Sequence, residues 1–278
     1  MNPVGPAPWH QPSWDARAAC NFMAGGAGSG LIVSAAVAGS SPLLTAIGAA
    51  AIALGLFAVW LELGRPWRSW RVPRHAARSW MSREALLAPL LFVAVAAAWL
   101  GVPAATWAAA VLALAFVYCQ ARLLQAAKGI PAWREPLLVP LLLATALAEG
   151  AGAWLALTAG ASAHGSLWAA FALLLVARLV LWQAWRARVR TVRAALAAID
   201  AAGAVFKLAT LLPLAAALVA IASPLGEPGL RALQIVAGVV ALIGGQWFKF
   251  TLVTRAGFNQ GYALPQLPVR GVPRSKEA

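Results

Sequence analysis

The fold is decided by the stretch Leu43-Leu-Thr-Ala-Ile-Gly-Ala-Ala-Ala-Ile-Ala-Leu-Gly-Leu-Phe-Ala-Val-Trp-Leu-Glu-Leu63, which carries a single charge, at Glu62. A helix that crosses the hydrocarbon core of a bilayer needs about 20 consecutive, mostly apolar residues. Similar runs recur along the chain, and most of the turns between them hold glycine and proline. We therefore predict eight transmembrane spans, at residues 17–38, 43–63, 84–102, 105–127, 136–159, 165–186, 202–222 and 229–254.

The composition agrees with these spans. Of the 278 residues, 62% are hydrophobic and 11% are charged, against roughly 25% charged in an ordinary soluble domain. We expect an all-α integral membrane protein, arranged as two four-helix bundles and without a separate soluble domain. Residues 1–16 form an N-terminal arm, residues 17–254 form the transmembrane domain with a charged loop at 64–83, and residues 255–278 form a tail.

The net charge of +14 is distributed unevenly. Eighteen of the 22 basic residues lie on one side: at the start of the first predicted span, in or next to the loops after the second, fourth and sixth spans, and in the tail. This asymmetry is typical of the positive-inside bias, and it argues against nucleic-acid binding. We expect both termini to lie on the charged side, in the cytoplasm.

Small residues are concentrated in the first predicted span. Gly26 and Gly30 form a GxxxG pattern, and Gly25 with Ser29 forms a looser version. Such residues let membrane helices approach closely, and they also leave room for a flat ligand. Both interpretations are open from the sequence.

The longest polar connection runs from Glu62 to Glu84 and carries an arginine every three or four residues. One interpretation is an interfacial segment, with arginines at lipid headgroups and Trp67, Trp70 and Trp80 at the acyl boundary. The other is a floor on which a partner protein docks above a ligand site. Composition alone does not separate them.

Ionisable residues inside spans are costly in lipid, so they are usually paired or functional. Glu149 lies deep in the fifth predicted span. Six others lie toward the charged side: Glu62, Glu84, Arg122, Arg178, Lys207 and Lys249. Three explanations are open for these residues. Long side chains near helix ends can extend to water, the charges can form structural ion pairs, or they can line a pocket for a polar headgroup.

Haem, iron–sulfur clusters and metal ions are not expected in this chain. His10, His75 and His164 all lie outside the predicted spans, whereas a haem within the bilayer needs ligands that project from helices. Cys20 and Cys119 are too few for an iron–sulfur cluster and lack zinc spacing. We predict no haem, no iron–sulfur cluster and no metal site.

Three segments resemble one membrane protein family. They are Leu61-Glu-Leu-Gly-Arg-Pro-Trp-Arg-Ser-Trp70 with Ser79-Trp-Met-Ser-Arg-Glu84, the first-helix segment Trp14–Gly28, and the tail Gly257-Phe-Asn-Gln-Gly-Tyr-Ala-Leu-Pro-Gln-Leu-Pro-Val-Arg-Gly271. They are similar to the membrane anchor subunits of molybdopterin oxidoreductases, which include the dimethyl sulfoxide reductase anchor and the polysulfide and nitrite reductase membrane subunits. The resemblance extends over the whole chain.

The resemblance implies a quinone-binding subunit in a bacterial inner membrane, in a complex that serves anaerobic respiration. Such an anchor binds menaquinone or ubiquinone. It exchanges electrons with a four-cluster iron–sulfur subunit, which serves a molybdopterin or tungstopterin catalytic subunit.

Two carboxylates are the expected proton-relay residues. Glu84 matches a family glutamate implicated in quinol binding. Glu62 stands where dimethyl sulfoxide reductase anchors have histidine and other branches have an acid. The expected quinone-binding residues are Asn21, Arg65, Trp67, His75, Trp80 and Lys249, of which Arg65 and Lys249 hold a carboxylate or a quinone oxygen and Trp67 and Trp80 stack on the ring.

The charge bias also bears on the substrate of the complex. It places the presumed docking face in the cytoplasm, which suits a cytoplasmic substrate such as phenylacetyl-CoA. The rival prediction is a secondary transporter with Glu149, Arg178 and Lys207 as coupling residues. A third is an assembly protein without a ligand.

Overall fold

The computed structural model describes residues 7–39, 41–160, 165–222 and 226–261. These residues form helices and no β-strand; the pairing of His10 with Phe258 is an isolated bridge. Eight helices are long and apolar enough to cross a membrane, so the chain is an all-α, multi-pass membrane protein as predicted. They are α1 (Ala16–Val37), α2 (Pro42–Glu62), α3 (Trp80–Trp99), α4 (Pro103–Ala126), α6 (Leu138–Leu157), α7 (Gly165–Arg188), α8 (Arg193–Ala222) and α9 (Glu227–Thr254).

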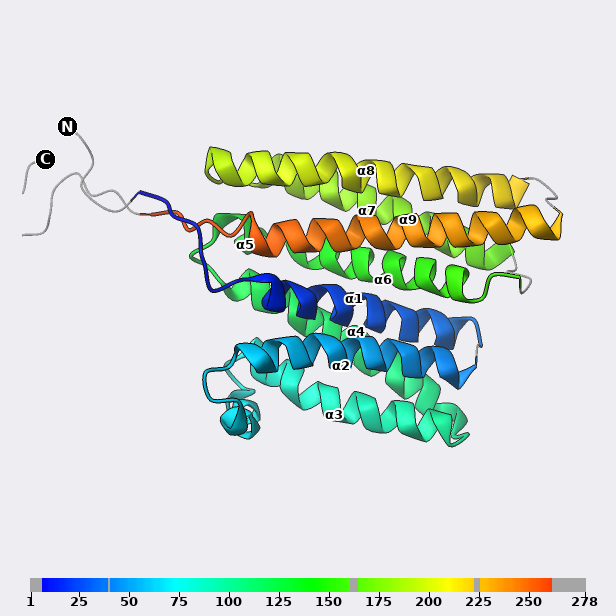
Figure 1. Ribbon diagram of the computed structural model, residues 1–278, viewed down its shortest axis with the longest axis horizontal. Helices are drawn as coiled ribbons and strands as arrows, with labels where there is room; N and C mark the ends of the chain where they lie inside the picture. The colour runs from blue at the N-terminus through cyan, green and yellow to red at the C-terminus, as the bar shows by residue number, and fades with distance from the viewer. Residues whose placement is uncertain (1–6, 40, 161–164, 223–225, 262–278) are drawn as a thin grey trace, which may run out of the picture.

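The long helices run side by side in two groups (Figure 1). Helices α1 to α4 pack together, α6 to α9 pack together, and α1 joins the groups by contacting both α6 and α9. Two short helices lie at one end of the molecule: η1 (Pro66–His75), a 3₁₀-helix, and α5 (Pro131–Arg134).

Two helices begin at least four residues earlier than the apolar pattern predicts. Helix α3 starts at Trp80 because the Ser79 hydroxyl accepts a hydrogen bond from the Ser82 amide and caps the first turn. Helix α8 starts at Arg193, before the predicted residue 202, and its first turns carry Asp200, which forms an ion pair with Arg186 of α7. Polar residues thus extend both helices beyond the predicted spans.

Glycines in α1 bring its backbone against neighbouring helices. A Cβ at Gly30 would overlap the carbonyl group of Ala146 in α6, and a Cβ at Gly28 would overlap the carbonyl oxygen of Gly48 in α2. The packing interpretation of the small residues therefore holds at Gly30. At Gly25 and Gly26 the space beside the glycine is filled by polar side chains, described below.

The arm lies along the beginning of the tail. The Trp9 amide donates to Asn259 Oδ1, the Asn259 amide donates to the Trp9 carbonyl, and the Gln11 amide donates to the Gly257 carbonyl. Both ends of the described chain are therefore at the end that carries η1 and α5 (Figure 1). The quoted tail motif beyond Gly261, and His164, lie outside the described residues.

Candidate functional site

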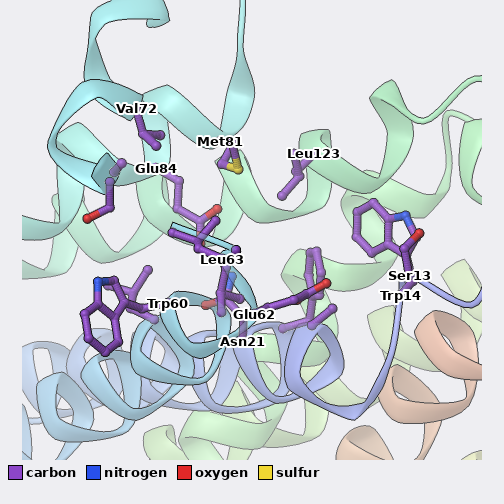
Figure 2. A pocket seen from close by; sticks show the side chains of 17 residues that line it. Ser13, Trp14, Asn21, Trp60, Glu62, Leu63, Val72, Met81, Glu84 and Leu123 are labelled. Carbon is purple, nitrogen blue, oxygen red and sulfur yellow. Dashed lines mark hydrogen bonds between the residues drawn. The ribbon is translucent and has the colours of Figure 1, made fainter. Parts of the chain in front are cut away.

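A cavity of about 530 Å³ opens at the charged end of the first bundle. Its walls come from α1 to α4, from η1 and from the end of the N-terminal arm, and most of the side chains that line it are apolar. Trp14 and Trp60 lie on opposite sides, with Glu62 and Glu84 between them (Figure 2). The cavity thus combines an apolar wall with two carboxylates.

Glu84 is the centre of a buried polar group. Its side chain is on the first turns of α3 and is 2% exposed. Its Oε1 accepts a hydrogen bond from Asn21 Nδ2 at 2.9 Å and another from Gln120 Nε2 at 3.2 Å. No described residue donates to Oε2, so this oxygen is available to a ligand in the cavity that Glu84 lines.

Asn21 has spare hydrogen-bonding capacity as well. Its Oδ1 is buried and has no hydrogen-bond partner among the residues that the structure describes. A buried polar atom without a partner costs about 1–3 kcal/mol. Asn21 and Glu84 both line the cavity, and each has an acceptor oxygen to which no described residue donates.

Two glycines make room for this polar group. A Cβ at Gly25 would overlap the amide of Gln120, and a Cβ at Gly55 in α2 would lie 3.0 Å from the Asn21 Cα. The Gln120 amide also donates to the Asn21 carbonyl at 2.9 Å. Glycine at these positions therefore allows α1, α2 and α4 to converge behind Glu84.

Glu62 lies at the rim. It is the last residue of α2, it is half-buried, and no described residue donates a hydrogen bond to its carboxylate. Nearby, Arg17 forms an ion pair with Asp15, and this hydrogen-bonded guanidinium lowers the pKa of the Asp15 carboxyl below its ordinary value. Glu62 and Glu84 therefore face one cavity in different surroundings, one at the rim and one buried.

One face of η1 covers the cavity. A 3₁₀-helix has three residues per turn, so residues three apart lie in one row. The row of Pro66, Ser69 and Val72 is half-buried, and Ser69 and Val72 line the cavity. The other two rows face away from it.

The predicted site residues fall into two groups. Asn21, Glu62 and Glu84 come together in the cavity. Arg65, Trp67, His75, Trp80 and Lys249 do not line it. On the η1 segment, Arg65, Trp67 and His75 are exposed, and Trp80 packs between the guanidinium groups of Arg83 and Arg122.

Lys249 belongs to a second buried polar group, between the bundles. Its ammonium donates to Glu149 Oε2 at 2.5 Å and to the carbonyls of Phe22 and Met23 in α1. A Cβ at Gly26 would overlap this ammonium group. Lys249 therefore does hold a carboxylate, but that carboxylate is Glu149.

Arg178 of α7 is also buried. Its guanidinium donates to the Thr210 hydroxyl and to the carbonyls of Ala209 and Ala241, and it lies 4.7 Å from the Phe206 ring centroid. Lys207 is apart from it, half-buried over the Trp182 ring. These contacts satisfy Arg178 within the protein.

Several site residues were missed from the sequence. Gln120 is uncharged, so it was not among the ionisable residues of the predicted spans. The signal that could have identified it is its position as a polar residue within an apolar span. Trp14 and Trp60 line the cavity, whereas the expected stacking residues Trp67 and Trp80 do not. Nothing in the local pattern distinguishes these tryptophans.

Comparison with known proteins adds no assignment. No known protein family matches this chain, and no curated protein matches it.

Proposed function

We propose that this chain binds a quinone in the cavity beside Glu84, as the membrane anchor subunit of a molybdenum or tungsten pterin oxidoreductase. The observation that carries the proposal is the position of a buried, hydrogen-bonded carboxylate in a largely apolar cavity of about 530 Å³. Binding sites for small organic ligands are typically apolar clefts of about 300–1,000 Å³ with a few placed polar groups.

The lining fits the parts of a quinone. A ring oxygen, when reduced, donates a hydrogen bond, and Glu84 Oε2 and Asn21 Oδ1 are acceptors without partners. Trp60, Trp14 and Phe22 provide apolar surface for the ring and tail. The α2 and α3 helices that form the walls are themselves membrane spans, so an apolar tail has a route to lipid.

Proton transfer is the chemistry assigned to the carboxylates. A quinone takes up two protons with two electrons when it is reduced. Glu84 holds or releases a proton at Oε2 while Asn21 and Gln120 fix its other oxygen. Glu62 at the rim exchanges protons with water.

A photoreactive azidoquinone tests the binding site. The purified full chain is labelled in detergent, and the labelled peptides are mapped by mass spectrometry, with an excess of unlabelled quinone as competitor. We expect competed labelling on residues 13–22, 56–64 and 81–85. Labelling that the competitor leaves unchanged, or that maps to α7 and α8, would overturn the site.

The Glu84→Gln variant tests the role of the carboxylate. Glutamine keeps an oxygen that accepts from Asn21 and Gln120, so the fold is retained while the charge at Oε2 is lost. A hydrogen bond to a charged group contributes roughly 1.5–3 kcal/mol, so the affinity for the reduced quinol, whose hydroxyl donates to Oε2, should fall by about tenfold or more. The matched control is Glu227→Gln, an exposed residue at the opposite end.

Co-purification tests the assignment to a complex. Recovery from native membranes with an iron–sulfur subunit and a pterin subunit is the expected result. The transporter alternative requires a path past Glu149, Arg178 and Lys207, yet the cavity beside Lys249 has a volume of about 10 Å³. Solute uptake into liposomes by the chain alone, lost in Glu149→Gln, would favour the transporter instead.

A further inference from the structure

The two outward rows of η1 carry distinct chemistry. Arg65 precedes the helix and starts a row with Arg68, Arg71 and Arg74, each three residues after the last. The adjacent row carries Trp67 and Trp70, which are 82% and 58% exposed. We call these six residues the basic–aromatic strip.

The strip has the orientation of a surface helix. Figure 1 shows η1 almost end-on beside the ends of α2 and α3, so it runs across the direction of the membrane-spanning helices. An amphipathic helix in this orientation lies in the plane of the membrane interface. The row that covers the cavity faces the protein, and the strip faces outward.

An aromatic column connects the strip to the lipid-facing surface of α2. Phe57, 53% exposed on α2, stacks on Trp60 with ring centroids 5.9 Å apart. Trp60 meets Trp67 edge-on at 5.6 Å. Tryptophan is enriched where the hydrocarbon core meets the headgroups, so this column places Trp67 at that depth.

The charge of the strip is not neutralised within the protein. Residues 63–83 hold six arginines and no acid. In the described part of the chain, none of the four strip arginines forms an ion pair. Arg71 and Arg74 lie against the Trp70 ring, 5.0 and 4.5 Å from its centroid, which positions their guanidinium groups beside an exposed indole.

We propose that the basic–aromatic strip binds the headgroups of anionic phospholipids in the leaflet at the charged end of the protein. The arginines bind the phosphates, and the two tryptophans lie at the level of the glycerol and upper acyl chains. Arginine is suited to this because its planar fork binds phosphate through two hydrogen bonds. This inference does not depend on quinone binding.

An acidic protein surface is the other chemistry that would match the arginines. The column from Phe57 to Trp67 favours lipid, because it continues the lipid-exposed face of α2 without a break. Two large exposed indoles beside each other also suit an interface that is apolar on one side and wet on the other.

Spin-labelled lipids test the proposal on the full chain. The protein is reconstituted in an equal mixture of phosphatidylglycerol and phosphatidylcholine, and the fraction of each spin-labelled lipid that is motionally restricted gives the selectivity. We expect wild type to prefer phosphatidylglycerol, and Arg68→Gln/Arg71→Gln/Arg74→Gln to lower that preference by about threefold or more, because each surface cation contributes to anionic-lipid affinity. High salt should weaken the wild-type preference.

Two further variants keep the test interpretable. Arg188→Gln/Arg190→Gln/Arg193→Gln removes the same charge from exposed residues between α7 and α8, and it should change the preference much less. Arg68→Lys/Arg71→Lys/Arg74→Lys keeps the charge and should retain most of the preference. Similar melting temperatures for all the variants exclude unfolding as the cause.

Hydrogen–deuterium exchange locates the effect. Amides of residues 66–75 should exchange more slowly in bilayers with phosphatidylglycerol than in phosphatidylcholine alone, and Trp67→Ala/Trp70→Ala should reduce that protection. Equal lipid preference in wild type and the glutamine variant would overturn the proposal. If that variant instead loses a co-purifying protein, the strip binds an acidic protein surface.

Discussion

Lys249 and Glu149 form an ion pair across 100 residues of sequence, with an N–O distance of 2.5 Å and both side chains almost fully buried. The pair joins α9 to α6, and the two carbonyl contacts of Lys249 extend it to α1. The bundles are therefore held together by buried charge as well as by glycine-mediated packing.

Breaking this ion pair should destabilise the protein strongly. Lys249→Met leaves the Glu149 carboxylate buried without its cation, which typically costs about 3–5 kcal/mol. Thermal unfolding in detergent, followed by circular dichroism, measures the loss. Replacing both residues, Glu149→Gln with Lys249→Met, should cost less than Lys249→Met alone.

The control for this prediction is the Arg186–Asp200 pair, which is partly exposed between α7 and α8. Arg186→Gln should change stability by about 0–1 kcal/mol, as is usual for a surface pair. A Lys249→Met loss no larger than the Arg186→Gln loss would mean that the buried pair does not join the bundles.

Alanine at Gly30 should be more damaging than alanine at Gly26. At Gly30 the new Cβ meets the backbone carbonyl of Ala146, which cannot move without separating α1 from α6. At Gly26 it meets the end of the Lys249 side chain, which is flexible. We expect losses of about 1–3 kcal/mol or more at Gly30, by analogy with overpacked cores.

Gly229→Ala is the matched control for both substitutions. It lies in α9 with open space where the Cβ would be, so alanine should be neutral or slightly stabilising. The melting temperature should be highest for Gly229→Ala, lower for Gly26→Ala and lowest for Gly30→Ala. The reverse order of the last two would contradict the close contact of α1 and α6.

Gln120→Leu tests whether Gln120 positions Glu84. The substitution removes the donor to Glu84 Oε1 and to the Asn21 carbonyl, which leaves two acceptors poorly satisfied. The affinity for the reduced quinol should fall, by less than in Glu84→Gln, because Oε2 keeps its charge and Asn21 still donates to Oε1.

A double-mutant cycle separates positioning from direct contact. If Gln120 acts through Glu84, the Glu84→Gln/Gln120→Leu variant should bind only slightly worse than Glu84→Gln. Fully additive losses would instead indicate that Gln120 contacts the ligand itself.

The cap of α1 should respond to acid. Asp15 accepts hydrogen bonds from the Arg17 and Ala18 amides, and Arg17 lowers its pKa below the ordinary value of 3.8. A lowered pKa in the folded state gives stability that is present above pH 3.8 and is lost as the pH falls through the folded pKa. The melting-temperature difference between wild type and Asp15→Asn should therefore shrink as the pH falls through this range; a constant difference would contradict it.

Hydropathy was sufficient to predict the eight helices, because each must present an apolar surface to lipid. It did not predict the start of α3 or α8, since Ser79 and Asp200 act through a local cap and a partner helix. Asn21 and Glu84 were both predicted as site residues. The hydrogen bond between them was not predicted, because nothing in their separate spans indicates it.

Lys249 shows why the rest of the site could not be predicted. Its place near the end of a span suggested a cation close to the surface, whereas its partner is fixed by how α6 and α9 pack. The sequence showed an arginine every three or four residues in this segment, and the observed 3₁₀ geometry of η1 aligns the residues that are three apart.

Through Gly25 and Gly26, α1 makes room both for the polar group around Glu84 and for the ion pair of Lys249 with Glu149. Consecutive residues of an α-helix point about 100° apart, so one glycine accommodates Gln120 and the next accommodates Lys249. Turning α1 about its own axis would open space for one side chain only by closing it for the other. The angular setting of this one helix therefore couples the cavity at Glu84 to the ion pair between the bundles.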